Sequence, residues 1–145
     1  MKLRNEKSLG VLYGVISLLV AMTASEVRAA GRDESVSLIN LIATPERYHG
    51  KVVAISAYVS IAMGNMSLCP TEHPLTNKDC LWLTIYSGPF KTSEDMERYN
   101  AEEKKWRPYH GRSVSLRGTF DKNETGHNGL WSGGIKKVTA ISDSE

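Results

Sequence analysis

The sequence predicts a mainly β domain of the α+β class, in which five strands close into a small barrel. Residues 51–61 and 81–86 alternate apolar and polar side chains with the period of two that marks a half-buried strand. Clusters of Gly, Pro and Asn separate the apolar segments, as turns do. Residues 92–107 carry helix signals and stand between the third and fourth expected strands.

The N-terminus has the three-part layout of a secretory signal peptide. Three basic residues precede an uncharged, mostly apolar run over residues 8–25. The small residues Val27 and Ala29 follow, and they predict cleavage after Ala29. An uncleaved membrane anchor is the alternative, because the run approaches the roughly 20 residues that cross a bilayer. We expect residues 1–29 to be the signal and residues 30–145 to form a single periplasmic or secreted domain.

A short helix is expected at the start of the domain. Residues 36–43 are too densely apolar for a solvated loop, with Ser35 as the N-cap and Pro45 near the end. Helical spacing predicts this buried side: Val36, Ile39 and either Ile42 or Ala43.

The clearest strand of the chain is expected over residues 51–61. Its odd-numbered positions from Val53 to Ile61 are apolar and share one face, whereas Tyr58 belongs to the opposite face. Gly64-Asn65 is a hairpin signal that leads into a short second strand around residues 66–69.

The third strand is expected over residues 81–86. Leu81, Leu83 and Ile85 share its inner face, and these residues share its outer face: Trp82, Thr84 and Tyr86. The loop before it lies between Cys69 and Cys80. An even cysteine count in an oxidising compartment favours a disulfide bond, with free thiols as the alternative.

A charged helix is expected from Thr92 to Arg107. Acidic residues come early in this segment and basic residues come late, which complements the helix dipole, and Thr92 and Asp95 have the spacing of a capping box. Three residues form the expected inward stripe: Met96, Tyr99 and Trp106.

Two further strands complete the chain. In residues 113–120 the inward positions are Val114, Leu116 and Phe120. The last strand is expected to begin near Leu130-Trp131 and to continue to Ile141, with a bulge or bend at Gly133-Gly134.

Tyr-His-Gly precedes both the first and the fourth strand, at Tyr48-His49-Gly50 and Tyr109-His110-Gly111. A paired histidine site is the alternative. We favour one structural solution used twice, in which Gly relieves the backbone where the chain turns into a strand.

A helix between the third and fourth of five strands matches the oligonucleotide/oligosaccharide-binding fold, the OB-fold, whose first and fourth strands are neighbours. A sandwich is the alternative, although it would have to accommodate that helix. Residues 38–53 (LINLIATPERYHGKVV), 118–121 (GTFD) and 126–133 (GHNGLWSG) resemble a widespread set of uncharacterised exported bacterial proteins with an OB-like domain. The resemblance covers most of residues 35–141 and implies a bacterial periplasmic setting and a fold rather than a reaction.

Composition and motifs argue against several function classes. The chain has 18 Lys plus Arg and 16 Asp plus Glu, of which residues 1–29 hold four and two, so 14 of each sign remain. A formally neutral domain lacks the basic excess of a nucleic-acid binder. The four histidines and two cysteines show no close zinc spacing, and we expect no metal and no cofactor. The sequence contains no nucleophile elbow and no phosphate loop.

One surface survives as a binding candidate. If the odd positions of the third strand fill the barrel, Trp82, Thr84 and Tyr86 face outward on the side that OB-folds use for ligands, with Tyr58 on a neighbouring strand. Exposed aromatic rings stack on bases, sugars or partner side chains. Alternatively, the N-terminal helix or the charged helix covers these rings.

The sequence therefore favours a binding module for a protein, peptide or glycan over an enzyme. A small periplasmic hydrolase with His127 or His110 as base is the alternative. An inhibitor or immunity-type protein that blocks a partner enzyme is a specialised form of the binding module.

Overall fold

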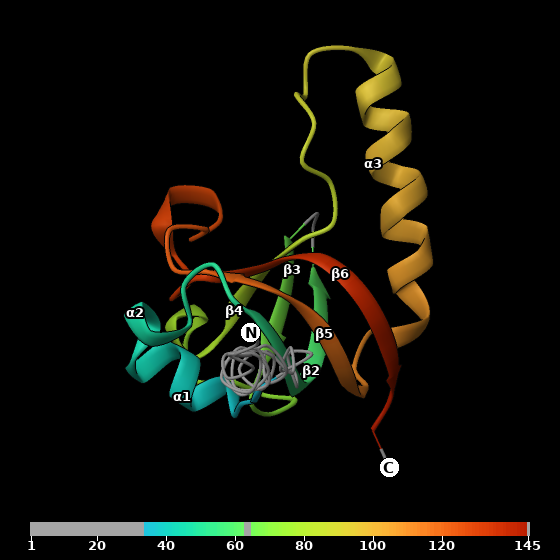
Figure 1. Ribbon diagram of the computed structural model, residues 1–145. Coiled ribbons are helices and arrows are strands. Elements are labelled where there is room, and N and C mark those ends of the chain that lie inside the picture. Colours follow the sequence, from blue (N-terminus) through green and yellow to red (C-terminus); the bar gives the residue numbers. More distant parts are fainter. Residues whose placement is uncertain (1–33, 63–64, 145) are drawn as a thin grey trace, which may run out of the picture. The chain divides into compact units, whose positions relative to one another are not determined.

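The computed structural model describes residues 34–62 and 65–144 (Figure 1). The expected signal peptide and Gly64 of the expected hairpin lie outside the described residues. The strands are β1 (Glu34–Ser35), β2 (Val52–Ala62), β3 (Asn65–Cys69), β4 (Leu81–Thr84), β5 (Ser113–Asp121) and β6 (Gly134–Asp143). The α-helices are α1 (Leu38–Ala43), α2 (Pro45–Tyr48) and α3 (Ser93–Trp106). Three single 3-10 turns are η2 (Asn77–Asp79), η3 (Arg107–Tyr109) and η4 (His127–Gly129).

Five strands form a ring in the order β2-β3-β4-β6-β5, which the pairing of β5 with β2 closes (Figure 1). The β4–β6 pair is parallel and the other four pairs of the ring are antiparallel. The mainly β, α+β class is confirmed, and α3 lies between the third and fourth strands of the ring as expected. The ring is not a regular barrel, because β4 has four residues and meets β3 through two residue pairs.

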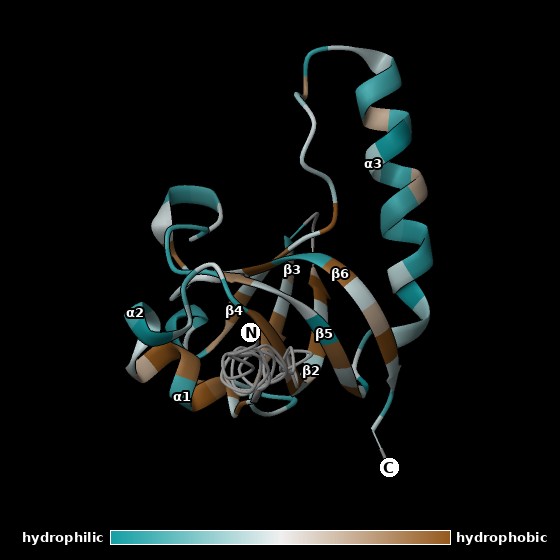
Figure 2. Cartoon of the chain, viewed as in Figure 1, coloured by the Kyte–Doolittle hydropathy of each residue, from teal (hydrophilic) through white to brown (hydrophobic). Residues whose placement is uncertain are grey.

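The alternation predicted from the sequence is confirmed in the interior of the ring. In β2 the side chains from Val53 to Val59 at every second position are buried, and Ile61 is half-buried. Leu81 and Leu83 are buried, and Ile85 packs against the same core from beyond the end of β4. Phe120 of β5 is fully enclosed. Figure 2 shows the strands richer in hydrophobic residues than α3.

The start of the domain differs from the prediction. Residues Glu34–Ser35 form β1, parallel to β2, and Val36 N donates to Ala54 O. This pairing keeps the chain extended, so the helix begins later and its N-cap is Ser37 rather than Ser35. Leu38 and Leu41 face the core, whereas Ile39 is 65% exposed.

The expected bulge is displaced along β6. Residues 130–133 precede the strand, and the pairs Arg117–Ala140 and Thr119–Lys136 leave residues 137–139 opposite Gly118. Lys137 takes a left-handed backbone conformation, with φ at 53°, to absorb these extra residues. The bulge therefore lies at Lys137, whereas at the expected bulge or bend the backbone turns before the strand, with φ at 127° for Gly133.

The two Tyr-His-Gly segments lie at opposite ends of the antiparallel β2–β5 pair. His49 Nδ1 accepts from Lys122 N at 3.4 Å, and His110 Nδ1 accepts from Ile61 N at 3.0 Å. Gly50 and Gly111 have φ angles of 77° and 72°. Each segment thus ends a helical turn, reverses the chain and caps the neighbouring strand, which confirms one structural solution used twice.

Candidate functional site

An open groove of about 720 Å³ lies along β4 and the chain that follows it, facing α3. We call it the aromatic groove, after its aromatic lining residues Trp82, Tyr86, Phe90 and Tyr99. Aliphatic and sulfur-containing side chains complete the apolar part of its wall: Met66, Ile85 and Met96. Its polar lining comes mainly from β4, β6 and the loop between β5 and β6: Thr84, Glu124, His127 and Lys136.

The structure gathers three of the four predicted binding residues in this groove. Trp82, Thr84 and Tyr86 line it, all of them half-buried. Tyr58 lies elsewhere, in a smaller hollow of about 230 Å³ that His73 and His110 also line. Within the described part of the chain, no group of three or more potential ligands could hold a metal ion.

Trp82 is held by other rings at the floor of the groove. Its ring meets the rings of His127 at 5.2 Å and Trp131 at 4.7 Å, both edge-to-face. Gly126 lies against it so closely that a Cβ at this position would be 2.7 Å from Trp82 Cε3. The partial cover of Trp82 thus comes from residues 126–131. The expected alternative, cover by the charged helix, holds in part for Tyr86, which contacts the first turn of α3.

Tyr86 is tied to the first turn of α3. Its hydroxyl donates to Asp95 Oδ1 at 3.0 Å, while Lys91 N and Thr92 N donate to Asp95 Oδ2 at 2.9 and 3.0 Å. Asp95 N in turn donates to Thr92 Oγ1, which confirms the predicted capping box. Burial, and then the Asp95 carboxylate, raise the pKa of Tyr86. The structure thereby fixes one wall of the groove.

The Asp95 carboxylate should make stability depend on pH. The backbone N–H of Lys91, followed by that of Thr92 and the Tyr86 hydroxyl, lowers the pKa of Asp95 below its ordinary value. A lowered folded-state pKa stabilises the fold above the unfolded value, and this contribution is lost as pH falls through the folded value. We expect Asp95→Asn to be less stable than wild type at neutral pH, with the difference shrinking in acid.

Urea unfolding of both proteins across the acidic range measures this difference. Glu97→Asn, on an exposed position of the same helix, is the matched control and should track wild type. A gap between Asp95→Asn and wild type that stays constant down to strong acid would contradict the assignment.

Sequence reasoning missed part of the groove wall. Phe90 was not singled out, yet it is 57% exposed and its ring contacts those of Tyr86 at 5.3 Å and Tyr99 at 5.5 Å. Met96 was expected to face inward but is 47% exposed. The reason is that the first turns of α3 lie beside the connection from residue 85 to 92 and away from the strands (Figure 1). Trp106, in the last turn, is the buried anchor of the helix.

At the charged end of the groove, the positive charge of Lys136 is balanced by an ion pair with Asp121. Lys136 Nζ pairs with Asp121 Oδ2 at 2.5 Å. This bond lowers the pKa of Asp121 and raises that of Lys136, and the negative charge of Glu124 adds to the rise at Lys136. Within residues 34–62 and 65–144, no hydrogen bond or ion pair engages the Glu124 carboxylate itself.

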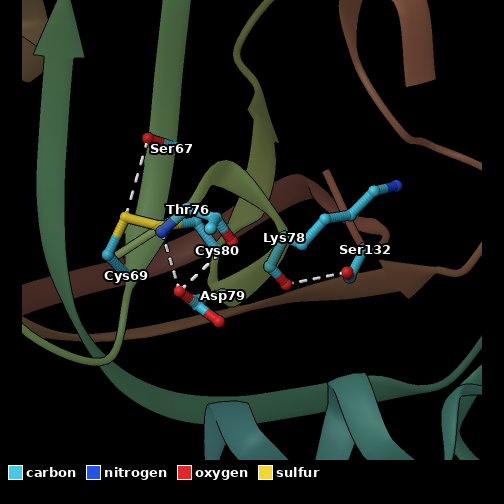
Figure 3. The surroundings of a disulfide bond; sticks show 7 residues. All are labelled: Ser67, Cys69, Thr76, Lys78, Asp79, Cys80 and Ser132. Carbon is cyan, nitrogen blue, oxygen red and sulfur yellow. Dashed lines mark hydrogen bonds between the residues drawn. A yellow bond between two sulfur atoms is a disulfide. The ribbon is translucent and has the colours of Figure 1, made fainter. Parts of the chain in front are cut away.

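A disulfide bond lies in the buried cluster against which Trp82 packs. Cys69 and Cys80 are bonded, with Cα atoms 4.4 Å apart, and both are buried against Trp131 (Figure 3). Ser132 Oγ donates to Lys78 O at 2.8 Å, and Lys78 Nζ donates to Gly129 O at 2.8 Å. The disulfide predicted from cysteine count is confirmed, and its loop is joined to the segment that covers Trp82.

The two histidines of the hydrolase hypothesis occupy different places. His110 caps β2 through Nδ1, whereas His127 is exposed at the groove with its ring against Trp82.

Two buried polar atoms of the described chain lack a hydrogen-bond partner, Thr84 Oγ1 and Trp131 Nε1. Residues 34–62 and 65–144 contain no helix long and apolar enough to span a bilayer.

Comparison with protein-family models, curated proteins and solved structures found no match to this chain.

Proposed function

We propose that this protein is an exported, periplasmic binding module that holds a peptide segment of a partner protein in the aromatic groove. The main support for this proposal is the groove itself, which has a volume of about 720 Å³ and is lined by four aromatic side chains. Clefts of several hundred Å³ with mostly apolar walls and a few polar groups are typical ligand sites.

The order of strands supports the finer parts of this proposal. We propose that the ring is an OB-like barrel, because β2-β3-β4-β6-β5 places a parallel pair between its third and fifth strands and a helix before the fourth. The groove then lies along the third strand of the ring, which belongs to the face that OB-folds use for ligands. The Cys69–Cys80 bond is compatible with an oxidising compartment, and export would follow from cleavage after Ala29.

The lining favours a peptide over a glycan. Ile85 and Met96 add apolar surface to the aromatic wall, and the exposed methionine adapts to side chains of differing shape. Sugar rings instead need many hydrogen-bond partners for their hydroxyls, whereas beyond the Tyr hydroxyls the polar side chains of this groove are few: Thr84, Ser87, Glu124, His127 and Lys136. An apolar wall with charge at one end suits an extended peptide with mixed side chains.

Selection from a phage-displayed library of random linear peptides on the immobilised domain tests the proposal. Phe90→Ala is the test variant, because Phe90 is exposed and its loss removes groove wall without opening the core. We expect enriched peptides to bind Phe90→Ala about tenfold more weakly than wild type, since an aromatic anchor contributes at least about 1.4 kcal/mol. Leu75→Ala is the matched control, because Leu75 is 96% exposed and does not line the groove.

Two outcomes would reject the peptide site. One is the absence of any enriched peptide; binding to an oligosaccharide array would then indicate a glycan instead. The other is enrichment of peptides whose affinity is the same for wild type and Phe90→Ala.

A further inference from the structure

The charged end of the aromatic groove holds more carboxylate than cation. Among its lining residues, the formally charged side chains are Glu124 and Lys136. Lys136 is already neutralised by its ion pair with Asp121, which lies just outside the lining. Glu124 therefore contributes a negative charge that the described residues leave without an ion pair.

This carboxylate lies next to the aromatic floor. A Cβ at Gly134, the residue paired with Trp82 between β4 and β6, would lie 2.7 Å from Glu124 Cγ, and both Trp82 and Glu124 line the groove. The groove is thus lined by the Trp82 ring and by a carboxylate, Glu124, that no ion pair or hydrogen bond engages within the described residues. An ammonium or guanidinium group is attracted to this carboxylate through a charge-assisted hydrogen bond.

From this juxtaposition we propose that the aromatic groove selects peptides that place a lysine or arginine side chain at its Glu124 end. The inference rests on the proposed peptide-binding function and adds the chemistry of the ligand. The cation binds beside Trp82 and Glu124, while apolar side chains of the same peptide pack along Tyr86, Phe90 and Met96. An acidic peptide is disfavoured, because its carboxylate would meet Glu124 with Lys136 already engaged.

Parallel library selections on three proteins test this specificity: wild type, Glu124→Gln and Glu97→Gln. Glu97 is an exposed acidic residue of α3 outside the groove, so its variant has the same change in net charge. We expect peptides enriched on wild type and on Glu97→Gln to contain an excess of Lys and Arg over the input library, and we expect this excess to disappear on Glu124→Gln.

Affinities of one enriched peptide and its Lys-to-Gln analogue complete the test. Wild type should bind the lysine form about tenfold more tightly, a hydrogen bond to a charged group being worth about that much, and added salt should narrow the gap. Glu124→Gln should bind both forms alike.

The outcomes separate the two proposals. Enriched peptides that depend on Phe90 but show no excess of basic residues would overturn the cation specificity and leave the peptide site standing. A basic excess that survives Glu124→Gln would also overturn it, because the carboxylate would not be the source. Failure to enrich any peptide on wild type would overturn both proposals.

Discussion

Replacing Cys69 and Cys80 together with alanine is expected to lower the free energy of unfolding by about 3 kcal/mol, the chain-entropy value for so short a loop. The bond closes a sequence separation of 11 residues. Without it the unfolded chain regains the freedom of that loop, while the folded state also loses sulfur atoms buried against Trp131. Urea unfolding followed by tryptophan fluorescence measures the change.

Reductant provides the control for this experiment. Wild type with dithiothreitol should approach the stability of the double variant, and the double variant should not respond to dithiothreitol. A loss below about 1 kcal/mol would show that the loop is held mainly by its hydrogen bonds, such as those that join Lys78 to Gly129 and to Ser132.

The disulfide also bears on the groove. Its loop is hydrogen-bonded to the segment that packs on Trp82, so the floor depends on a covalent brace as well as on ring packing. We therefore expect the double variant to bind the enriched peptides more weakly than wild type even at temperatures where it remains folded.

The local sequence pattern was enough to predict the strands in which every second side chain is buried, and the start of the long helix. Alternation placed Val53, Ile55, Leu81 and Leu83 in the interior, because a strand on a closed ring has one inner face. Cap chemistry located the start of α3, because Thr92 and Asp95 satisfy each other's backbone groups without help from distant residues.

Elements that depend on partners far along the chain were not predictable in the same way. Ser35 was assigned to a helix cap, but pairing with β2 keeps it in a strand. The bulge at Lys137 depends on the register against β5, which sequence periodicity does not report. The third strand was expected to reach residue 86 but ends at Thr84, because Tyr86 turns away to bond Asp95.

The same distinction holds for the groove. Trp82, Thr84 and Tyr86 were found because they alternate with core residues on one strand. Phe90 was missed, since its place depends on how the connection before α3 lies against the helix. Glu124 was also missed. It carries no local signal, and the loop around Gly126 brings it to Trp82 only through tertiary packing.

Gly126→Ala is expected to destabilise the protein by about 4 kcal/mol, combining about 2 kcal/mol for a backbone conformation (φ 63°, ψ −161°) that almost only glycine adopts with about 2 kcal/mol for overpacking. Gly126 has φ at 63°, and a Cβ there would lie 2.6 Å from Trp131 Cε3 and 2.7 Å from Trp82 Cε3. Both rings are rigid and are held by each other and by the disulfide, so neither side chain can yield by changing rotamer alone.

Gly129→Ala is the reference for a positive-φ glycine that has open space at its Cβ position. Gly129 has nearly the same φ, 66°, but the nearest atom to its Cβ would be Thr125 Oγ1 at an ordinary 3.8 Å. Its substitution should therefore cost about 1 kcal/mol, for its positive φ alone. Urea unfolding of both variants measures the difference, and near-ultraviolet circular dichroism reports whether the tryptophan rings have moved. Equal losses for Gly126→Ala and Gly129→Ala would show that the Trp82 floor accommodates a methyl group, and the floor would then be too soft to hold a cation beside Glu124 in a fixed geometry.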